Sequence, residues 1–196
     1  MLLDNRKGVE ERTRQLFAVC KRRRMPIFTF VNKCDRAGEN PLKLLSDVES
    51  ELGIDCYPVT WPVFHSGGGL AGVYDRRTRT VTLFERTEDH GASIADTLVY
   101  DMDAPDLLKI VGAEGIAQLA EEVSLLDEAG HQWSREALLD GSMTPVHFGS
   151  ALTNFGVEAF LQDFLALAPA PTARESNIGP IEPTRPEFTG FVFKIQ

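Results

Sequence analysis

The sequence predicts an α/β fold in which a parallel sheet with flanking helices carries an inserted α+β subdomain. Two observations predict the sheet: strand, helix and strand patterns follow one another within the first 31 residues, and a strand–helix pattern returns near residue 144. A third predicts the insertion, because the residues between these regions have the pattern of an antiparallel hairpin followed by a helix.

Residues 1–31 predict a strand–helix–strand unit with parallel strands. Met1 to Leu3 is an apolar triplet typical of the end of a buried strand. Apolar residues from Val9 to Cys20 fall on one stripe of a helix, which starts with acidic residues and ends with the basic run Lys21 to Arg24. A favourable helix C-terminus explains that run better than a contact with RNA or protein. Ile27 to Val31 lacks alternation, as expected of a strand covered on both faces.

A second crossover helix is predicted from Asn40 to Leu52. Asn40 can cap it, Pro41 suits its first position, and Gly53 is a typical stop. We therefore expect this helix to be a second crossover element of the sheet.

The inserted subdomain is predicted over residues 57–143. Residues 72–75 and 80–84 are two short runs around a basic turn, and they predict an antiparallel hairpin. An acidic helix follows near residues 114–128. Its apolar stripe predicts burial of one face, and its carboxylates are expected to face water rather than a metal ion.

The parallel sheet is predicted to resume at residues 144–149 and to be followed by a helix over about 156–167. Prolines concentrate between Pro169 and Pro186, which predicts a stiff interdomain linker. Residues 188–196 alternate like a strand without a partner, so we expect the chain to begin and end inside larger units. The expected divisions are 1–56 and 144–168 for the sheet domain, 57–143 for the insert, 169–187 for the linker and 188–196 for a further domain.

Composition narrows the class of protein. The 196 residues are 43% hydrophobic and 25% charged, which excludes a disordered chain or a collagen-like repeat. No apolar run is long enough to span a bilayer and no leader pattern is present, so we expect a cytoplasmic protein without a membrane partner. The net charge of −9 argues against a surface that coats nucleic acid, and no DNA partner is expected. The three cysteines have no CxxC spacing, so neither a disulfide framework nor a zinc site is predicted.

The most specific motif is Asn32-Lys33-Cys34-Asp35, directly after a buried parallel strand, where open α/β sheets place their ligand residues. The Asp35 carboxylate offers two acceptor oxygens, which match the ring N–H and exocyclic amine of guanine. Asn32 can bridge the base and neighbouring loops with its amide, and the stem of Lys33 can lie on the plane of the base. The pattern predicts guanine recognition, with a plain polar turn as the alternative.

A second candidate segment, Gly149-Ser150-Ala151-Leu152, also follows a predicted strand. Its small residues let backbone N–H groups approach a ligand, and one of them could meet the guanine carbonyl oxygen. The histidines are scattered without metal-ligand spacing. His147 is expected to be packed in the core, and its proximity to Ser150 does not make a nucleophile pair.

Together these motifs, the start of the insert at residues 57–62, the segment 7–13 and the exit segment 188–195 resemble the peptide chain release factor 3 family of bacterial translational GTPases. The resemblance runs along the whole chain, and elongation factor G is the next most similar group. The resemblance to the release factor 3 family implies that the chain is the carboxyl-terminal part of a P-loop-type GTPase domain with its insert, followed by the first strand of a β-barrel domain.

The resemblance also implies roles for particular residues. Asn32, Lys33 and Asp35 would recognise guanine in GTP or GDP. Ser150, Ala151 and Leu152 would form the turn over the base. Magnesium would bind only in an intact protein of the family, which acts on the ribosome and promotes departure of the stop-codon-reading release factors.

Catalytic motifs of such a GTPase are absent from this sequence. Phosphate binding needs G-x-x-x-x-G-K-[ST], but the glycines at Gly67 and Gly72 are followed by Val73 and Tyr74. The Asp-x-x-Gly strings starting at Asp35 and Asp127 lie in the wrong context. Two hypotheses therefore remain: part of a GTPase, or a non-catalytic unit for guanine recognition or ribosome contact.

Overall fold

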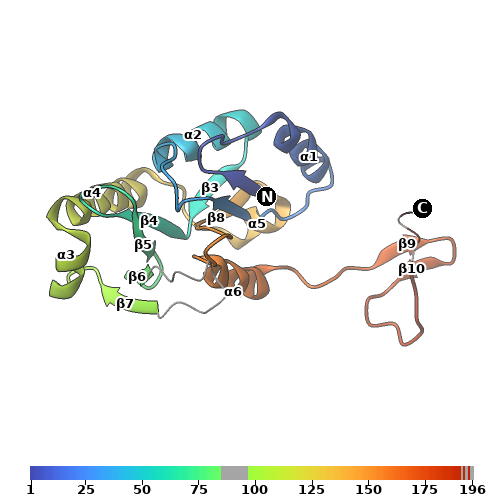
Figure 1. Ribbon diagram of the computed structural model, residues 1–196. Helices are drawn as coiled ribbons and strands as arrows, with labels where there is room; N and C mark the ends of the chain where they lie inside the picture. Colours follow the sequence, from blue (N-terminus) through green and yellow to red (C-terminus); the bar gives the residue numbers. More distant parts are fainter. Residues whose placement is uncertain (85–96, 191, 193, 195–196) are drawn as a thin grey trace.

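Two four-stranded sheets organise the computed structural model (Figure 1), which describes residues 1–84, 97–190, 192 and 194. The first sheet has the strand order β1-β2-β8-β3, and every neighbouring pair in it is parallel. Its strands are β1 (Leu2–Asp4), β2 (Thr29–Asn32), β3 (Asp55–Pro58) and β8 (Met143–Phe148). The predicted α/β fold with a parallel sheet is confirmed.

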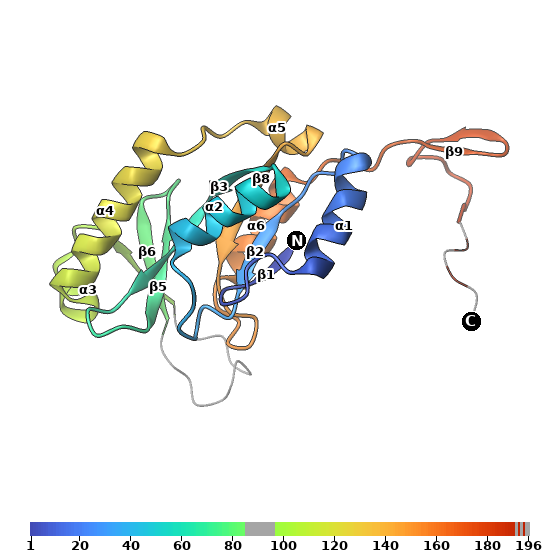
Figure 2. The ribbon, with the colours of Figure 1, turned by 90° about the horizontal axis from the view of Figure 1, so that it is seen from above.

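Helices cover both faces of this sheet (Figures 1 and 2). They are α1 (Glu11–Arg22) and α2 (Pro41–Leu52) on one face and α6 (Val157–Leu167) on the other. Phe28 and Phe30 make edge-on ring contacts with Phe164 and Phe160 of α6. Successive strand residues point to opposite faces, so Val31 is buried in the other core layer. Burial on both sides explains why residues 27–31 show no alternation.

The predicted start and stop of α2 are confirmed. The Asn40 side-chain oxygen accepts hydrogen bonds from the N–H groups of Leu42 and Lys43, which the helix itself leaves without partners. Gly53 ends the helix in a left-handed conformation with φ +61°.

The second sheet is antiparallel and has the order β4-β5-β6-β7. Its strands are β4 (Thr60–Phe64), β5 (Leu70–Asp75), β6 (Thr80–Phe84) and β7 (Thr97–Asp101). The predicted hairpin is formed by β5 and β6. The associated helices are α3 (Pro105–Val111) and α4 (Ala113–Ala129), while α5 (Arg135–Asp140) leads back to the first sheet and packs on β8. Tyr57 and Pro58 still pair with β8, so the chain passes from the first sheet to the second at Val59. The insert was predicted to start two residues earlier, at residue 57. The division into domains stays a prediction.

Trp61 joins the second sheet to the first. Its ring is fully buried and meets Phe148 of β8 edge-on at 5.2 Å, while its indole N–H donates to the carboxylate of Glu122 on α4 at 2.7 Å. Gln118, one helical turn earlier, donates to the other oxygen of Glu122. Glu122 is therefore buried, which corrects the expectation that all carboxylates of the acidic helix face water.

A charge cluster, buried at Asp163 and half-exposed at Arg77, connects the β5–β6 turn to α6. Arg77 forms an ion pair with Asp163, and the Nε2 atom of His147 lies 3.2 Å from an oxygen of the same carboxylate. His147 is packed in the core, as predicted. Burial by itself would raise the pKa of Asp163, but the His147 imidazole and the Arg77 guanidinium hold that pKa below its usual value.

Arg77→Ala is expected to lower the free energy of unfolding by about 2 kcal/mol at pH 7, because the buried carboxylate of Asp163 loses its ion pair. The loss is smaller than for a fully buried pair because the guanidinium is half-exposed. A depressed carboxyl pKa gives stability that is lost as the pH falls through it. The difference between variant and parent should therefore shrink below about pH 4. Urea unfolding at several pH values measures it, and a pH-independent difference would contradict the role of the ion pair.

The segment after α6 extends away from the rest of the chain (Figure 1). It contains a two-stranded antiparallel ribbon, β9 (Arg174–Ser176) with β10 (Gly179–Ile181), which the proline pattern of the predicted linker did not show. The two strands are joined by a tight turn at residues 177–178, and Gly179, which follows the turn, has a φ of +97°. Of the strand predicted at 188–196, residues 191, 193, 195 and 196 lie outside the described residues, and the described ones are not in a strand.

Candidate functional site

Two loops lie side by side at the carboxyl ends of adjacent parallel strands. The NKCD loop, residues 32–39, follows β2, and the GSAL turn, residues 149–152, follows β8. Since β2 and β8 are neighbours in the sheet, the fold brings the two predicted motifs to one place.

Hydrogen bonds join the two loops directly. The side-chain oxygen of Asn32 accepts from the N–H of Ala151 at 2.9 Å and from the N–H of Lys33 at 2.8 Å. The Cys34 N–H donates to the carbonyl of Gly149 at 3.0 Å. Asn32 thus joins the two loops, as its sequence context predicted, and its contact with a base stays a prediction.

The Asp35 carboxylate is partly exposed at the end of the NKCD loop. Its side chain is 25% exposed, and its one ion contact among the described residues is with Arg36, at 3.6 Å. A carboxylate in this position can accept two parallel hydrogen bonds from a ligand.

Lys33 has an unusual backbone conformation, with φ +68°. Its ammonium group lies 2.7 Å from a carboxylate oxygen of Asp4, at the end of β1. The hydrogen bond from Lys33, together with that from the Arg6 N–H, holds the pKa of Asp4 below its usual value. The stem of Lys33 is therefore fixed at its charged end.

Cys34 faces the core rather than the site. Its thiol is buried and lies 3.3 Å from the Val31 carbonyl, to which it donates. Burial raises the pKa of this thiol to about 12, so it stays protonated near neutral pH and is not a nucleophile.

The GSAL turn is closed by a pair of backbone hydrogen bonds between Ser150 and Phe155. Ser150 is fully buried, whereas Ala151 is exposed and the Leu152 side chain is 58% exposed. The N–H groups of Ser150 and Ala151 are already bonded within the protein. Within the described part of the chain, this leaves the N–H of Leu152 to meet a ligand.

The family model of the elongation factor Tu GTP binding domain matches residues 1–170. The chain belongs to this family. It is 48% identical over all 196 residues to peptide chain release factor 3 of Synechocystis and of Listeria innocua, and it covers 36% and 37% of their lengths. The resemblance found in the motifs is thereby confirmed.

Similarity to a solved structure supports the fold of this chain but not its function. A crystal structure of a protein from Thermus thermophilus superimposes with a TM-score of 0.61 at 22% identity, covering 87% of this chain and 26% of that one.

Two other findings bear on ligands and membranes. Among the residues that the structure describes, no group of three His, Cys, Asp or Glu side chains is arranged to hold a metal ion. In the same part of the chain, no helix combines the length and apolar character needed to cross a bilayer.

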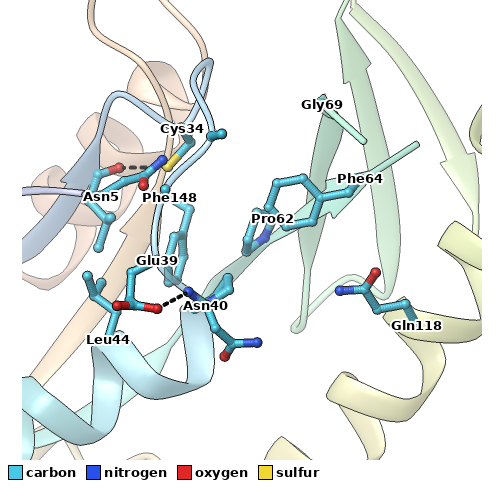
Figure 3. Close-up of a pocket in the computed structure, with 14 residues that line it drawn as sticks. Asn5, Cys34, Glu39, Asn40, Leu44, Pro62, Phe64, Gly69, Gln118 and Phe148 are labelled. Carbon is cyan, nitrogen blue, oxygen red and sulfur yellow. Dashed lines mark hydrogen bonds between the residues drawn. The ribbon is translucent and has the colours of Figure 1, made fainter. Parts of the chain in front are cut away.

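Sequence reasoning missed two residues that contact the NKCD loop, Asp4 and Asn5. Asp4 ends β1 and Asn5 follows it, next to β2, so the rule that ligand residues lie at the carboxyl ends of parallel strands could have found them. Asn5 also lines a cavity of about 280 Å³ between the NKCD loop and β4. Figure 3 shows Asn5 and Cys34 on one side of this cavity, with Pro62 and Phe64 across from them.

Proposed function

We propose that this chain provides the base-recognising half of the guanine nucleotide site of a translational GTPase similar to release factor 3. The observation that carries the proposal is the junction of the NKCD loop and the GSAL turn through Asn32, which leaves the Asp35 carboxylate available to a ligand.

Each site residue then has a physical task. Asp35 would accept the ring N–H and exocyclic amine of guanine, which adenine cannot supply in that arrangement. The N–H of Leu152 would donate to the guanine carbonyl oxygen, and the stem of Lys33 would cover the plane of the base. Asn32 holds the loops together, and Ser150 and Ala151 shape the turn.

The chain spans about a third of the length of the curated relatives it matches. We infer that a full-length protein of this kind binds GTP and GDP, works in the cytoplasm on the ribosome and promotes departure of the stop-codon-reading release factors. The sequence has no G-x-x-x-x-G-K-[ST] motif, so the residues present do not fit the phosphates or magnesium. That absence also favours a second candidate, a unit that recognises guanine or contacts the ribosome without turnover.

Asp35→Asn is expected to weaken GDP binding by about 10- to 100-fold and to improve binding of xanthosine diphosphate. The substitution exchanges one acceptor for a donor, and xanthine carries a carbonyl oxygen where guanine carries its amine. Competition against a fluorescent guanine nucleotide measures both affinities.

Asp106→Asn on α3 is the matched control, because it removes an exposed carboxylate that pairs with Lys109 far from the two loops along the chain. It should leave the nucleotide preference unchanged. Unaltered guanine preference in the Asp35 variant would refute the proposed base contact.

A further inference from the structure

The NKCD loop is held from two sides. In the sheet order β1-β2-β8-β3, the strand β2 that carries the loop lies between β8 and β1. The GSAL turn holds the loop from the β8 side, as described above. The residue that follows β1, Asn5, holds it from the other side.

Every polar group of Asn5 except its side-chain oxygen is bonded to this loop. The side-chain amide donates to the carbonyl oxygens of Lys33 at 3.1 Å and Arg36 at 3.0 Å. The backbone N–H donates to the Asn32 carbonyl, and the backbone carbonyl accepts from the Glu39 N–H, each at 3.0 Å. The side chain and the two flanking peptide groups of Asn5 thus contact the loop from its first residue to its last.

The bonds of Asn5 fall where the loop is most strained. Lys33 has a left-handed backbone conformation, which is costly for a residue with a long side chain and persists where the surroundings enforce it. Its N–H is bonded by the Asn32 side chain and its carbonyl by the Asn5 side chain. The peptide units on both sides of Lys33 are therefore fixed by amide side chains, and Asp35 is two residues further on.

Gly38 is fitted to the Asn5 side chain. A Cβ atom at Gly38 would lie 1.1 Å from the Asn5 side-chain oxygen, so no other residue fits while Asn5 keeps its position. The orientation of the amide follows from its neighbours, because two carbonyl oxygens require its donor end. The Asn5 side chain thus packs directly against Gly38, in space that a side chain at residue 38 would occupy.

We propose that Asn5 is a positioning residue for base selectivity: it fixes the Lys33 peptide and thereby the direction in which Asp35 meets the exocyclic amine of guanine. This inference rests on the proposed guanine site and adds a residue outside both motifs. Asn5 needs no contact with the nucleotide for this role.

The test compares GDP with inosine diphosphate, whose base lacks the exocyclic amine, by isothermal titration calorimetry. The parent chain should prefer GDP, and Asn5→Ala should reduce that preference by about tenfold because two hydrogen bonds to the loop are lost. Asn5→Asp, of the same size, should reduce it further, since a carboxylate oxygen would face two carbonyl oxygens. Arg6→Ala, with an exposed side chain in the same turn, should leave the preference unchanged.

A purely structural role has a different signature. If the Asn5 variants lower the melting temperature but keep the parent preference for GDP, the inference is overturned. Gly38→Ala gives an independent readout: it should disturb the loop in the parent but add little in the Asn5→Ala background, where the colliding oxygen is absent. Equal effects of Gly38→Ala in both backgrounds would also count against the contact between Asn5 and Gly38.

The proposed function and this inference fail in distinguishable ways. A parent chain with no preference for GDP over ADP refutes the guanine site itself. Whether Asn5 stabilises the loop is then tested by the rate of hydrogen exchange at the Cys34 N–H, which donates to the Gly149 carbonyl between the two loops. A faster exchange rate in Asn5→Ala supports this stabilisation, and an unchanged rate overturns it.

Discussion

Replacing Trp61 with alanine is expected to lower the free energy of unfolding by about 4 kcal/mol, because a fully buried indole is lost from the contact between the two sheets. The cavity would open beside Phe148, which the indole meets edge-on. The Glu122 carboxylate would also lose its indole donor while staying buried. Chemical denaturation followed by circular dichroism measures the loss.

Trp133→Ala is the matched control for this experiment. Trp133 is 36% exposed and packs on Tyr57 at the surface, so its removal should cost about 1 kcal/mol or less. Equal losses for the two tryptophans would show that Trp61 does not join the sheets.

Two further variants separate packing from hydrogen bonding at Trp61. Trp61→Phe keeps much of the ring but removes the N–H, and we expect a loss of about 2 kcal/mol as Glu122 is left short of a donor. Combining it with Glu122→Leu removes both partners of this hydrogen bond and should recover part of that loss, because the exposed amide of Gln118, which also donates to Glu122, can bond to water instead. No recovery in the double variant would mean that the buried hydrogen bond contributes little.

The parallel sheet and the two loops at its edge could be predicted from sequence because each signal is local. A strand buried on both faces has a run without alternation at residues 27–31, and Asn40, Pro41 and Gly53 mark the ends of α2 by their own backbone chemistry. The two motifs each follow a strand, and adjacency of β2 and β8 then brings them together.

The features that sequence did not reveal depend on contacts distant in the chain. In the sequence, Glu122 looks like the other solvent-facing carboxylates of an acidic helix. It is buried because Trp61, distant in the chain, packs against it and donates a hydrogen bond to it. Asn5 resembles an ordinary turn residue until Lys33 and Arg36 are placed beside it. The position of the two motifs in the fold was therefore predictable, while the residues that hold the loops in place were not.

The small size of Gly149 has a structural reason that its sequence context did not reveal. Sequence analysis explained its small size by the approach of a ligand to the backbone. In the structure, a Cβ atom at Gly149 would lie 2.2 Å from the Phe155 carbonyl oxygen and 2.7 Å from the ring of Phe30. The protein itself occupies the space, and the carbonyl in question is the one that closes the GSAL turn onto Ser150.

Gly149→Ala is therefore expected to lower the free energy of unfolding by about 3 kcal/mol, because backbone and ring must both shift to admit one methyl group. Guanine binding should fall with it, since the shift separates Ser150 from Phe155 and disturbs the bond between Ala151 and Asn32. Thermal unfolding and GDP titration measure the two effects. Gly67→Ala is the matched control, because nothing lies within 4 Å of its added Cβ, and its stability should stay close to that of the parent. A Gly149 variant as stable as the Gly67 variant would show that the turn can open without cost, and the rigid junction on which the proposed site depends would then be wrong.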